Sequence, residues 1–132
     1  MARVVLDSSA WIHLERQRGP LPGFTESDQA IMAPAALAEL LVAGHISTRS
    51  VQARNATLKF VKDALRVAEF VPVDQLTTEI FATLKAFSRD QGRPRGVNDL
   101  WIAATAIRAD AELLTLDDGA YFEDLPGLIL RR

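Results

Sequence analysis

The segment Val4-Val5-Leu6-Asp7-Ser8-Ser9-Ala10-Trp11 joins a strand signal directly to a helix signal. Residues 4–6 form a continuous apolar run, which is typical of a strand buried on both faces, as the strands of parallel sheets are. The run stops at Asp7, and Ser8 or Ser9 can cap the helix that follows. A buried strand that passes at once into a helix indicates an α/β protein.

The same alternation of strand and helix continues along the chain. Further strands are expected at 30–33, 70–73, 112–115 and 128–130, and further helices at 35–43, 47–68, 74–89 and from Asn98, an N-cap candidate. The segment 47–68 is either one helix or a pair of helices, which forms a cover or an arm on the domain. Pro72 favours a position at the edge of the sheet for the strand at 70–73. The pattern predicts an α/β fold with a mainly parallel sheet of four to five strands flanked by helices.

Length and composition limit the kinds of protein that this chain can be. With 132 residues and 48% hydrophobic content, it suits a single domain over 1–132. The absence of cysteine excludes disulfides, thiolate nucleophiles and cysteine-ligated metals, and it fits a reducing cytoplasm. Pro34 and Glu39 interrupt the apolar run around 30–44, so we expect a cytoplasmic protein with no signal peptide and no membrane span.

Asp99 is a carboxylate at the start of an otherwise apolar helix. On a helix it shares one face with Ile102, Ala103 and Ala106, so it points toward the side that packs against the rest of the protein. The alternative is that Asp99 only complements the helix dipole, which is worth about 0.3–1 kcal/mol. Acids in comparable settings elsewhere in the chain favour a functional role.

Glu39 has small apolar neighbours on its helix, and a buried carboxylate needs a cation, a hydrogen-bond network or a proton, unless it reaches solvent at the helix edge. Asp7 and Asp117 each follow a predicted strand, and sites in parallel sheets form beyond the carboxyl ends of strands. Asp74 also ends a strand, but its place directly before a helical pattern favours an N-cap. The acids expected to share one pocket are Asp7, Glu39, Asp99 and Asp117.

Four carboxylates in one pocket cannot all ionise without compensation. Oxygen ligands suit Mg²⁺ or Mn²⁺, whereas the two histidines, His13 and His45, form no zinc-ligand cluster. The chemistry that follows is metal-assisted attack of water on a phosphodiester. The net charge of −2 at first argues against a nucleic-acid partner. With the acids gathered in a metal site, however, the remaining surface is neutral to slightly basic.

Four segments together resemble a known family. They are Val4-Val5-Leu6-Asp7-Ser8-Ser9, Ala38-Glu39-Leu40, Val97-Asn98-Asp99-Leu100-Trp101-Ile102-Ala103-Ala104 and Leu114-Thr115-Leu116-Asp117. In their order, spacing and total length they are similar to the PIN-domain ribonucleases, specifically the VapC toxins of bacterial VapBC toxin–antitoxin pairs. The resemblance covers essentially the whole chain. It implies a PIN-like, Mg²⁺-dependent endoribonuclease, often a homodimer, that cuts structured RNA and is held inactive by a VapB-like antitoxin.

The resemblance can be carried over residue by residue. It assigns the metal-binding acids of the family to Asp7, Glu39, Asp99 and Asp117, with Asp118 as an alternative to Asp117. It also assigns the small hydroxyl positions to Ser8 and Thr115, beside Asn98 at the helix start.

Two parts of the surface are expected to contact macromolecules. Arg89, Arg93 and Arg95 precede the acid helix and suit RNA phosphates, although each can equally be a solubilising surface charge. An antitoxin can cover apolar side chains of the first helix and the Glu39 helix, unless all of these belong to the core. Those side chains are Trp11, Leu14, Leu40 and Leu41.

Two other functions remain open. An aspartyl-phosphate phosphatase or receiver-like domain also places Asp after its first strand, but it would want a second Asp where Ser9 stands, or a Lys near the last strand. A non-catalytic adaptor on a PIN scaffold is the other alternative, since a fold does not establish an activity. Loss of one or more acids would be its signature, and all four are present.

Overall fold

The computed structural model describes residues 1–118 and 122–131. In these ranges the chain forms four strands, β1 (Arg3–Leu6), β2 (Gln29–Met32), β3 (Glu69–Phe70) and β4 (Glu112–Leu114). It also forms five helices, α1 (Ser8–Glu15), α2 (Pro34–Ala43), α3 (Val51–Val67), α4 (Gln75–Asp90) and α5 (Val97–Arg108). Strands and helices alternate for most of the chain, which confirms the predicted α/β class.

The four strands form one parallel sheet in the order β3-β2-β1-β4. Val4, Val5 and Leu6 of β1 are fully buried, as the apolar run predicts for a strand with neighbours on both sides and helices over its faces. The strand expected at 128–130 is only a single parallel bridge between Leu130 and Leu113 of β4. The sheet therefore has four strands and the beginning of a fifth.

The predicted strand at 70–73 was wrong in its bounds, because β3 begins one residue earlier and ends at Phe70. The backbone N–H of Val71 still donates to the carbonyl of Met32 at 3.3 Å. Pro72 has no N–H to continue the ladder. The strand lies at the edge of the sheet, as Pro72 predicted.

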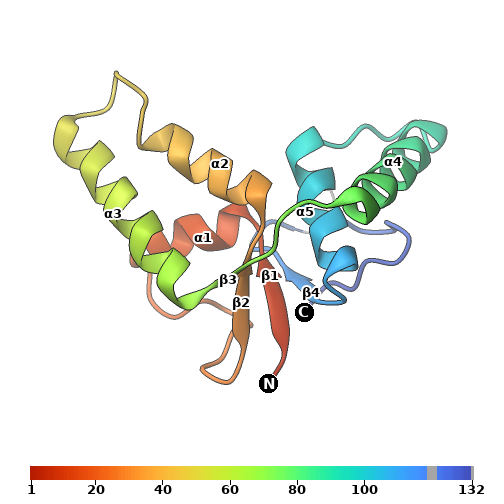
Figure 1. Cartoon of the computed structure of the whole chain (residues 1–132), viewed down its shortest axis with the longest axis horizontal. Helices are drawn as coiled ribbons and strands as arrows, with labels where there is room; N and C mark the ends of the chain where they lie inside the picture. Colours follow the sequence, from red (N-terminus) through yellow and green to blue (C-terminus); the bar gives the residue numbers. More distant parts are fainter. Residues whose placement is uncertain (119–121, 132) are drawn as a thin grey trace.

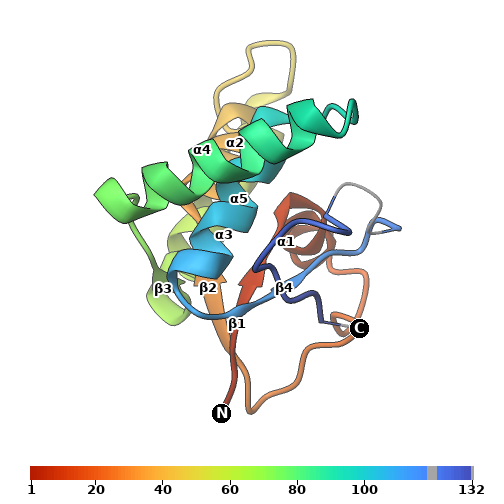
Figure 2. The same cartoon turned by 90° about the vertical axis from the view of Figure 1, so that its right-hand side faces the viewer.

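The helices form two groups in Figure 1, with α1, α2 and α3 to the left of the sheet and α4 and α5 to the right. The segment 47–68 contains one helix, α3, which begins after the N-cap Ser50 and packs against α2. Figure 2 shows α4 lying across α5, and the rings of Phe81 and Trp101 stack between these two helices with centroids 3.9 Å apart. No helix in the described ranges is long and apolar enough to cross a membrane.

Helix starts differ from prediction at two places. Asp7, rather than Ser8 or Ser9, is the N-cap of α1. Gly96, rather than Asn98, is the N-cap of α5, so Asn98 lies exposed within the first turn. Asp74 caps α4 as predicted, in a capping box with Thr77.

The core also absorbs side chains that were expected on a docking surface. Trp11 and Leu40 are each only 3% exposed and pack in the hydrophobic core. Leu14 and Leu41 are partly buried against the same core. The apolar residues of the first helix and the Glu39 helix are therefore mainly structural.

Candidate active site

The carboxyl ends of β1 and β4 lie side by side because these strands pair in parallel. Asp7 follows β1 directly, and its backbone N–H donates to the carbonyl of Leu114 at 3.1 Å. Asp117 follows β4 after two further residues. The topology thus brings two of the predicted acids to one edge of the sheet.

Asp7 is held firmly in the interior. It is 3% exposed, and its Oδ1 accepts hydrogen bonds from the backbone N–H of Ala10 (3.0 Å) and from Ser9 Oγ (2.6 Å). The first bond caps α1, where the helix dipole favours negative charge. The cap and the strand end therefore fix the position of this carboxylate from two sides.

Ser9 connects the Asp7 carboxylate to the segment after β4. Its Oγ accepts from the backbone N–H of Leu116 (3.0 Å) and lies 3.4 Å from Thr115 Oγ1. Because the Ser9 proton goes to Asp7, Thr115 is the donor in that second contact. Thr115 Oγ1 in turn accepts from the backbone N–H of Asp117 at 3.1 Å. Ser9 and Thr115 thus hold the first and last acids of the site in register.

Ser8 was the predicted hydroxyl of the site, whereas Ser9 is the serine that hydrogen-bonds to Asp7. Ser8 Oγ is buried and has no hydrogen-bond partner in the described ranges, and Ser8 lines the pocket beside α2. Ser9 stands two residues after Asp7, a spacing at which a hydroxyl commonly bonds a nearby acid or backbone group. That local preference was the signal for Ser9.

Asp99 lies half-buried in the first turn of α5. Burial raises the pKa of its carboxyl, and the charges of Glu39, Asp7 and Asp117 raise it further. No hydrogen bond within the described residues ends on this carboxylate. It packs closely against Gly96, because a Cβ added to that glycine would lie only 3.2 Å from Asp99 Oδ2. Asp99 therefore lies within electrostatic reach of the three other predicted acids.

Asp117 is exposed on the segment after β4. Partial loss of water around the carboxyl is the largest cause that raises its pKa, and the charges of Asp7 and Asp118 raise the pKa further. Asp117, and not Asp118, is among the acids that raise the pKa of Asp99. Asp117 is thus the closer of the two alternatives to the acid of α5.

Glu39 is half-buried on the second turn of α2 and lines a pocket between α1, α2 and α3. The sequence left two alternatives for Glu39, burial in the interior or contact with solvent at the edge of the helix, and the observed position lies between them. The carboxylate is neither enclosed in the core nor freely exposed, and it is close enough to Asp99 to raise the pKa of that group.

The four acids thus come from four different segments and form one electrostatic cluster. No group of three acidic or histidine side chains in the described ranges is gathered tightly enough to enclose a metal ion as the side chains stand. The donors of the cluster are all carboxylate oxygens, the type that Mg²⁺ and Mn²⁺ prefer. The donor set therefore fits a hard divalent cation, with rotation of the side chains needed to bring the oxygens together.

The three arginines predicted to bind RNA lie in unlike settings. Arg89 is exposed in the last turn of α4, and Arg93 pairs with Asp124 at 3.6 Å. Arg95 is 6% exposed and donates to Ser88 Oγ at 2.9 Å, so its expected role at the surface was wrong. The reason is that the α4–α5 connection turns this side chain inward.

Comparisons with known proteins agree with this geometry. The family profile of the PIN domain matches residues 4–128. Ribonuclease VapC5 of Mycobacterium tuberculosis is 35% identical over 116 residues, which cover 86% of this chain and 82% of that protein. Ribonuclease VapC of Rickettsia bellii is 29% identical over 114 residues, which cover 86% of this chain and 84% of that protein.

A solved structure supports the same grouping. The crystal structure of VapBC-5 from Mycobacterium tuberculosis, a member of the VapBC family of toxin–antitoxin systems, superposes with a TM-score of 0.80 and 27% identity, and the match covers 100% of both chains. The PIN domain profile matches nearly the whole sequence, and Ribonuclease VapC5 is 35% identical to it over most of both chains. The chain therefore belongs to the PIN domain family and, within it, to the VapC proteins.

Proposed function

We propose that the chain is a metal-dependent endoribonuclease toxin that hydrolyses RNA phosphodiester bonds at the cluster of Asp7, Glu39, Asp99 and Asp117. The observation that carries the proposal is that the parallel strands β1 and β4 and the helices α2 and α5 bring four acids within electrostatic reach of one another. The pKa of Asp99 is raised by its burial and then by the charges of Glu39, Asp7 and Asp117. Carboxylates held this close together repel one another, and a bound cation would remove that repulsion. The similarity to Ribonuclease VapC5 supports RNA as the substrate.

Each acid has a distinct part in such a site. Bound among these oxygens, Mg²⁺ or Mn²⁺ supplies an activated water and neutralises charge on the transferring phosphoryl group. Asp7 is the fixed ligand, since Ala10 and Ser9 hold its Oδ1. The pKa values of Asp99 and Asp117 are raised by burial and by neighbouring acids, and a cation held by these two carboxylates would favour their charged form. Ser9 and Thr115 keep the Asp117 segment against the end of β1.

Neither rival function has comparable support. A receiver-like site would need an acid at position 9, where Ser9 instead donates to Asp7. A non-catalytic adaptor needs no cluster of acids, yet all four acids are present and Asp99 faces the other three.

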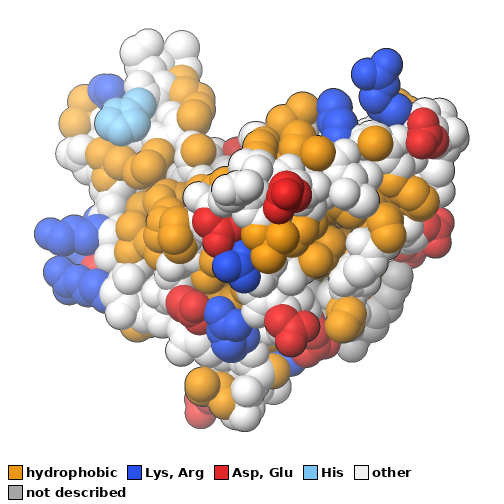
Figure 3. All heavy atoms as spheres, turned by 45° about the vertical axis from the view of Figure 1, so that its right-hand side comes forward, with side chains coloured by type: hydrophobic (Ala, Val, Ile, Leu, Met, Phe, Trp, Pro, Cys, Tyr) orange, Lys and Arg blue, Asp and Glu red, His pale blue; other side chains and the backbone are white. Residues whose placement is uncertain are grey.

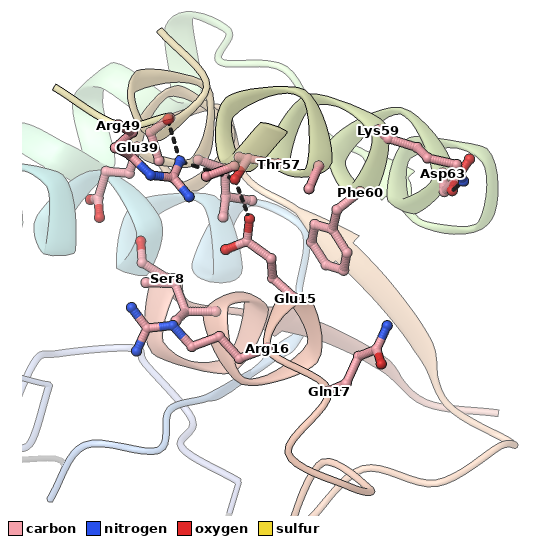
Figure 4. Close-up of a pocket in the computed structure, with 15 residues that line it drawn as sticks. Ser8, Glu15, Arg16, Gln17, Glu39, Arg49, Thr57, Lys59, Phe60 and Asp63 are labelled. Carbon is pink, nitrogen blue, oxygen red and sulfur yellow. Dashed lines mark hydrogen bonds and ion pairs between the residues drawn. The ribbon is translucent and has the colours of Figure 1, made fainter. Parts of the chain in front are cut away.

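We also propose that a VapB-like antitoxin inhibits the chain by binding the pocket between α1, α2 and α3, and that the chain forms a homodimer. The pocket has a volume of about 840 Å³ and is lined by both Ser8 and Glu39. Figure 4 shows Glu39 and Ser8 in one part of the pocket and Phe60 of α3 in another. A peptide seated there would contact apolar surface and the acid site together. VapBC complexes among the similar structures support such a partner.

Incubation of the purified chain with total cellular RNA tests the proposed activity. We expect cleavage with Mg²⁺ or Mn²⁺, with discrete ends on mapping, and none with EDTA. Asp7→Asn should abolish cleavage because it removes the fixed ligand, whereas Asp90→Asn, at the exposed end of α4, should cleave like the wild type. Undiminished cleavage in EDTA would overturn the metal mechanism. Absence of cleavage under all conditions would favour the adaptor.

A further inference from the structure

Arg95 makes a buried connection between three parts of the chain. Its Nη1 donates to Ser88 Oγ of α4 (2.9 Å) and to Gln91 Oε1 (3.2 Å), and its Nη2 donates to the backbone carbonyl of Glu123 (2.9 Å). Ser88 is itself buried and donates to the carbonyl of Leu84. The guanidinium therefore links α4 to the segment that follows the last strand.

The two ends of this connection lie close in sequence to two acids of the site. Arg95 directly precedes Gly96, the N-cap of α5, and stands four residues before Asp99. Glu123 stands six residues after Asp117. A second ion pair, Arg93 with Asp124 at 3.6 Å, runs between the same two segments. The residues just before α5 are thus joined to Glu123 and Asp124 of the segment that follows the last strand.

A buried guanidinium is an uncommon means of packing two segments, because removing its charge from water is costly. Apolar residues of similar volume often hold such segments equally well. The planar fork of arginine differs in that it sets the direction and distance of several acceptors at once. Here the acceptors include two side chains near the end of α4 and one main-chain oxygen, which is the arrangement expected of a spacer.

We propose that Arg95 is a positioning residue that fixes the start of α5, and with it the place of Asp99, and that it thereby sets the affinity of the acid site for a divalent cation. The inference rests on the proposed metal-dependent function. Groups that hydrogen-bond a metal ligand directly change metal affinity by about 10–100-fold when they are removed. Arg95 acts one step further from the ligands, through the start of α5, so we expect an effect near the lower end of that range.

The experiment measures the Mn²⁺ concentration that gives half of the maximal thermal stabilisation, without RNA, for the wild type, Arg95→Met and Arg95→Lys. We expect Arg95→Met to raise that concentration at least about tenfold, and Arg95→Lys to restore part of the loss. Hydrogen exchange in EDTA gives a second readout without metal. The amide of Leu125, which donates to the carbonyl of Phe122, should exchange faster in Arg95→Met.

Arg108→Met is the matched control, because Arg108 also joins two helices, through Asp74 at 2.8 Å, and is not part of the acid site. It should lower the melting temperature and leave the half-saturating Mn²⁺ concentration unchanged. If Arg95→Met does not fold, Ser88→Ala removes one acceptor alone and should produce a smaller rise. An unchanged half-saturating concentration in the folded variant, with a normal response of the wild type, would overturn the role of Arg95. Absence of any response in the wild type would overturn the proposed metal site itself.

Discussion

The Asp99 carboxylate lies in a setting that disfavours its negative charge. Its helix packs an apolar face into the core, and the first turn leaves the carboxylate half-buried opposite Glu39, Asp7 and Asp117. Burial and like charges both disfavour ionisation. A divalent cation reverses the sign of that interaction, so the same geometry that weakens the apoprotein strengthens the complex.

The stability of the apoprotein should therefore depend on pH at this position. The pKa of Asp99 is raised in the folded chain, so its favourable contribution to folding is present in acid and is lost as the pH rises through the folded pKa. In EDTA, Asp99→Asn should equal the wild type in acid and exceed it in stability at neutral pH. Thermal melts of both proteins across this range measure the difference.

Other acids have a pKa that is lowered in the folded chain, so their effect on stability depends on pH in the opposite direction. Comparing wild type with Asp99→Asn cancels the effect of these acids. Asp28 and Glu69, for example, have a lowered pKa beside Arg131 and Arg3, and the stability that they provide is lost as the pH falls. These groups act equally in both proteins. A stability difference between wild type and Asp99→Asn that did not change with pH would contradict the assigned electrostatics.

Individual residues of the site were predictable where a pattern isolated them. Asp99 could be found because it interrupts an apolar helix face, and Asp7 because it ends a buried strand. Ser9 had only a weak local signal and Arg95 had none, since a serine near an acid and an arginine before a glycine are common at surfaces. Their roles depend on partners far along the chain, Leu116 and Glu123, that only the folded topology brings near.

The pocket between α1, α2 and α3 depends on how α3 is fastened. Thr57, which is 1% exposed on α3, accepts from Arg49 Nη1 (3.1 Å) and donates to Glu15 Oε2 of α1 (2.6 Å). These hydrogen bonds cross the pocket in Figure 4 and hold α3 against α1. Hydrophobic side chains are also visible on the surface of this part of the molecule (Figure 3). Val42 of α2 and Ile46 of the connection between α2 and α3 are both exposed.

A bulky residue in that pocket should separate inhibition from catalysis. Ala56→Trp fills space beside Thr57 on an exposed turn of α3, so it should block a VapB-like antitoxin and leave RNA cleavage intact. The free energy of unfolding should change by no more than about 0.5 kcal/mol. The measurement is RNA cleavage with increasing amounts of an antitoxin that restores growth to cells making the chain.

Ala82→Trp, on the exposed face of α4, is the matched control and should be inhibited like the wild type. Full inhibition of Ala56→Trp would place the partner elsewhere on the molecule.

Helices and strands were predictable in kind more than in their ends. The start of α4 was predictable because Asp74, a good N-cap residue, stands directly before a helical pattern. The start of α5 was not, since Gly96 carries no capping side chain and Asn98 is the stronger local signal. In β3 the apolar residues continue past Phe70, but pairing stops where Pro72 removes a donor.

The distribution of charge over the molecule agrees with a nucleic-acid substrate. The net charge is −2 with all acids counted as ionised. Once the four acids of the cluster are assigned to a cation, the rest of the chain carries a small positive charge. A polyanionic strand then meets little repulsion outside the site, and inside it the cation supplies the attraction.

The central claim is that the four acids bind a divalent cation together, and thermal melts of wild type and Asp99→Asn with EDTA and with excess Mg²⁺ test it most directly. The wild type should gain about 2.7 kcal/mol when free metal is about a hundredfold above Kd. Asp99→Asn should lose much of that gain, because one of the four ligands becomes a neutral amide. Asp90→Asn, whose side chain is exposed at the end of α4, should keep the gain. Equal Mg²⁺-induced shifts in wild type and Asp99→Asn would contradict the account and return Asp99 to the role of an ordinary helix-start charge.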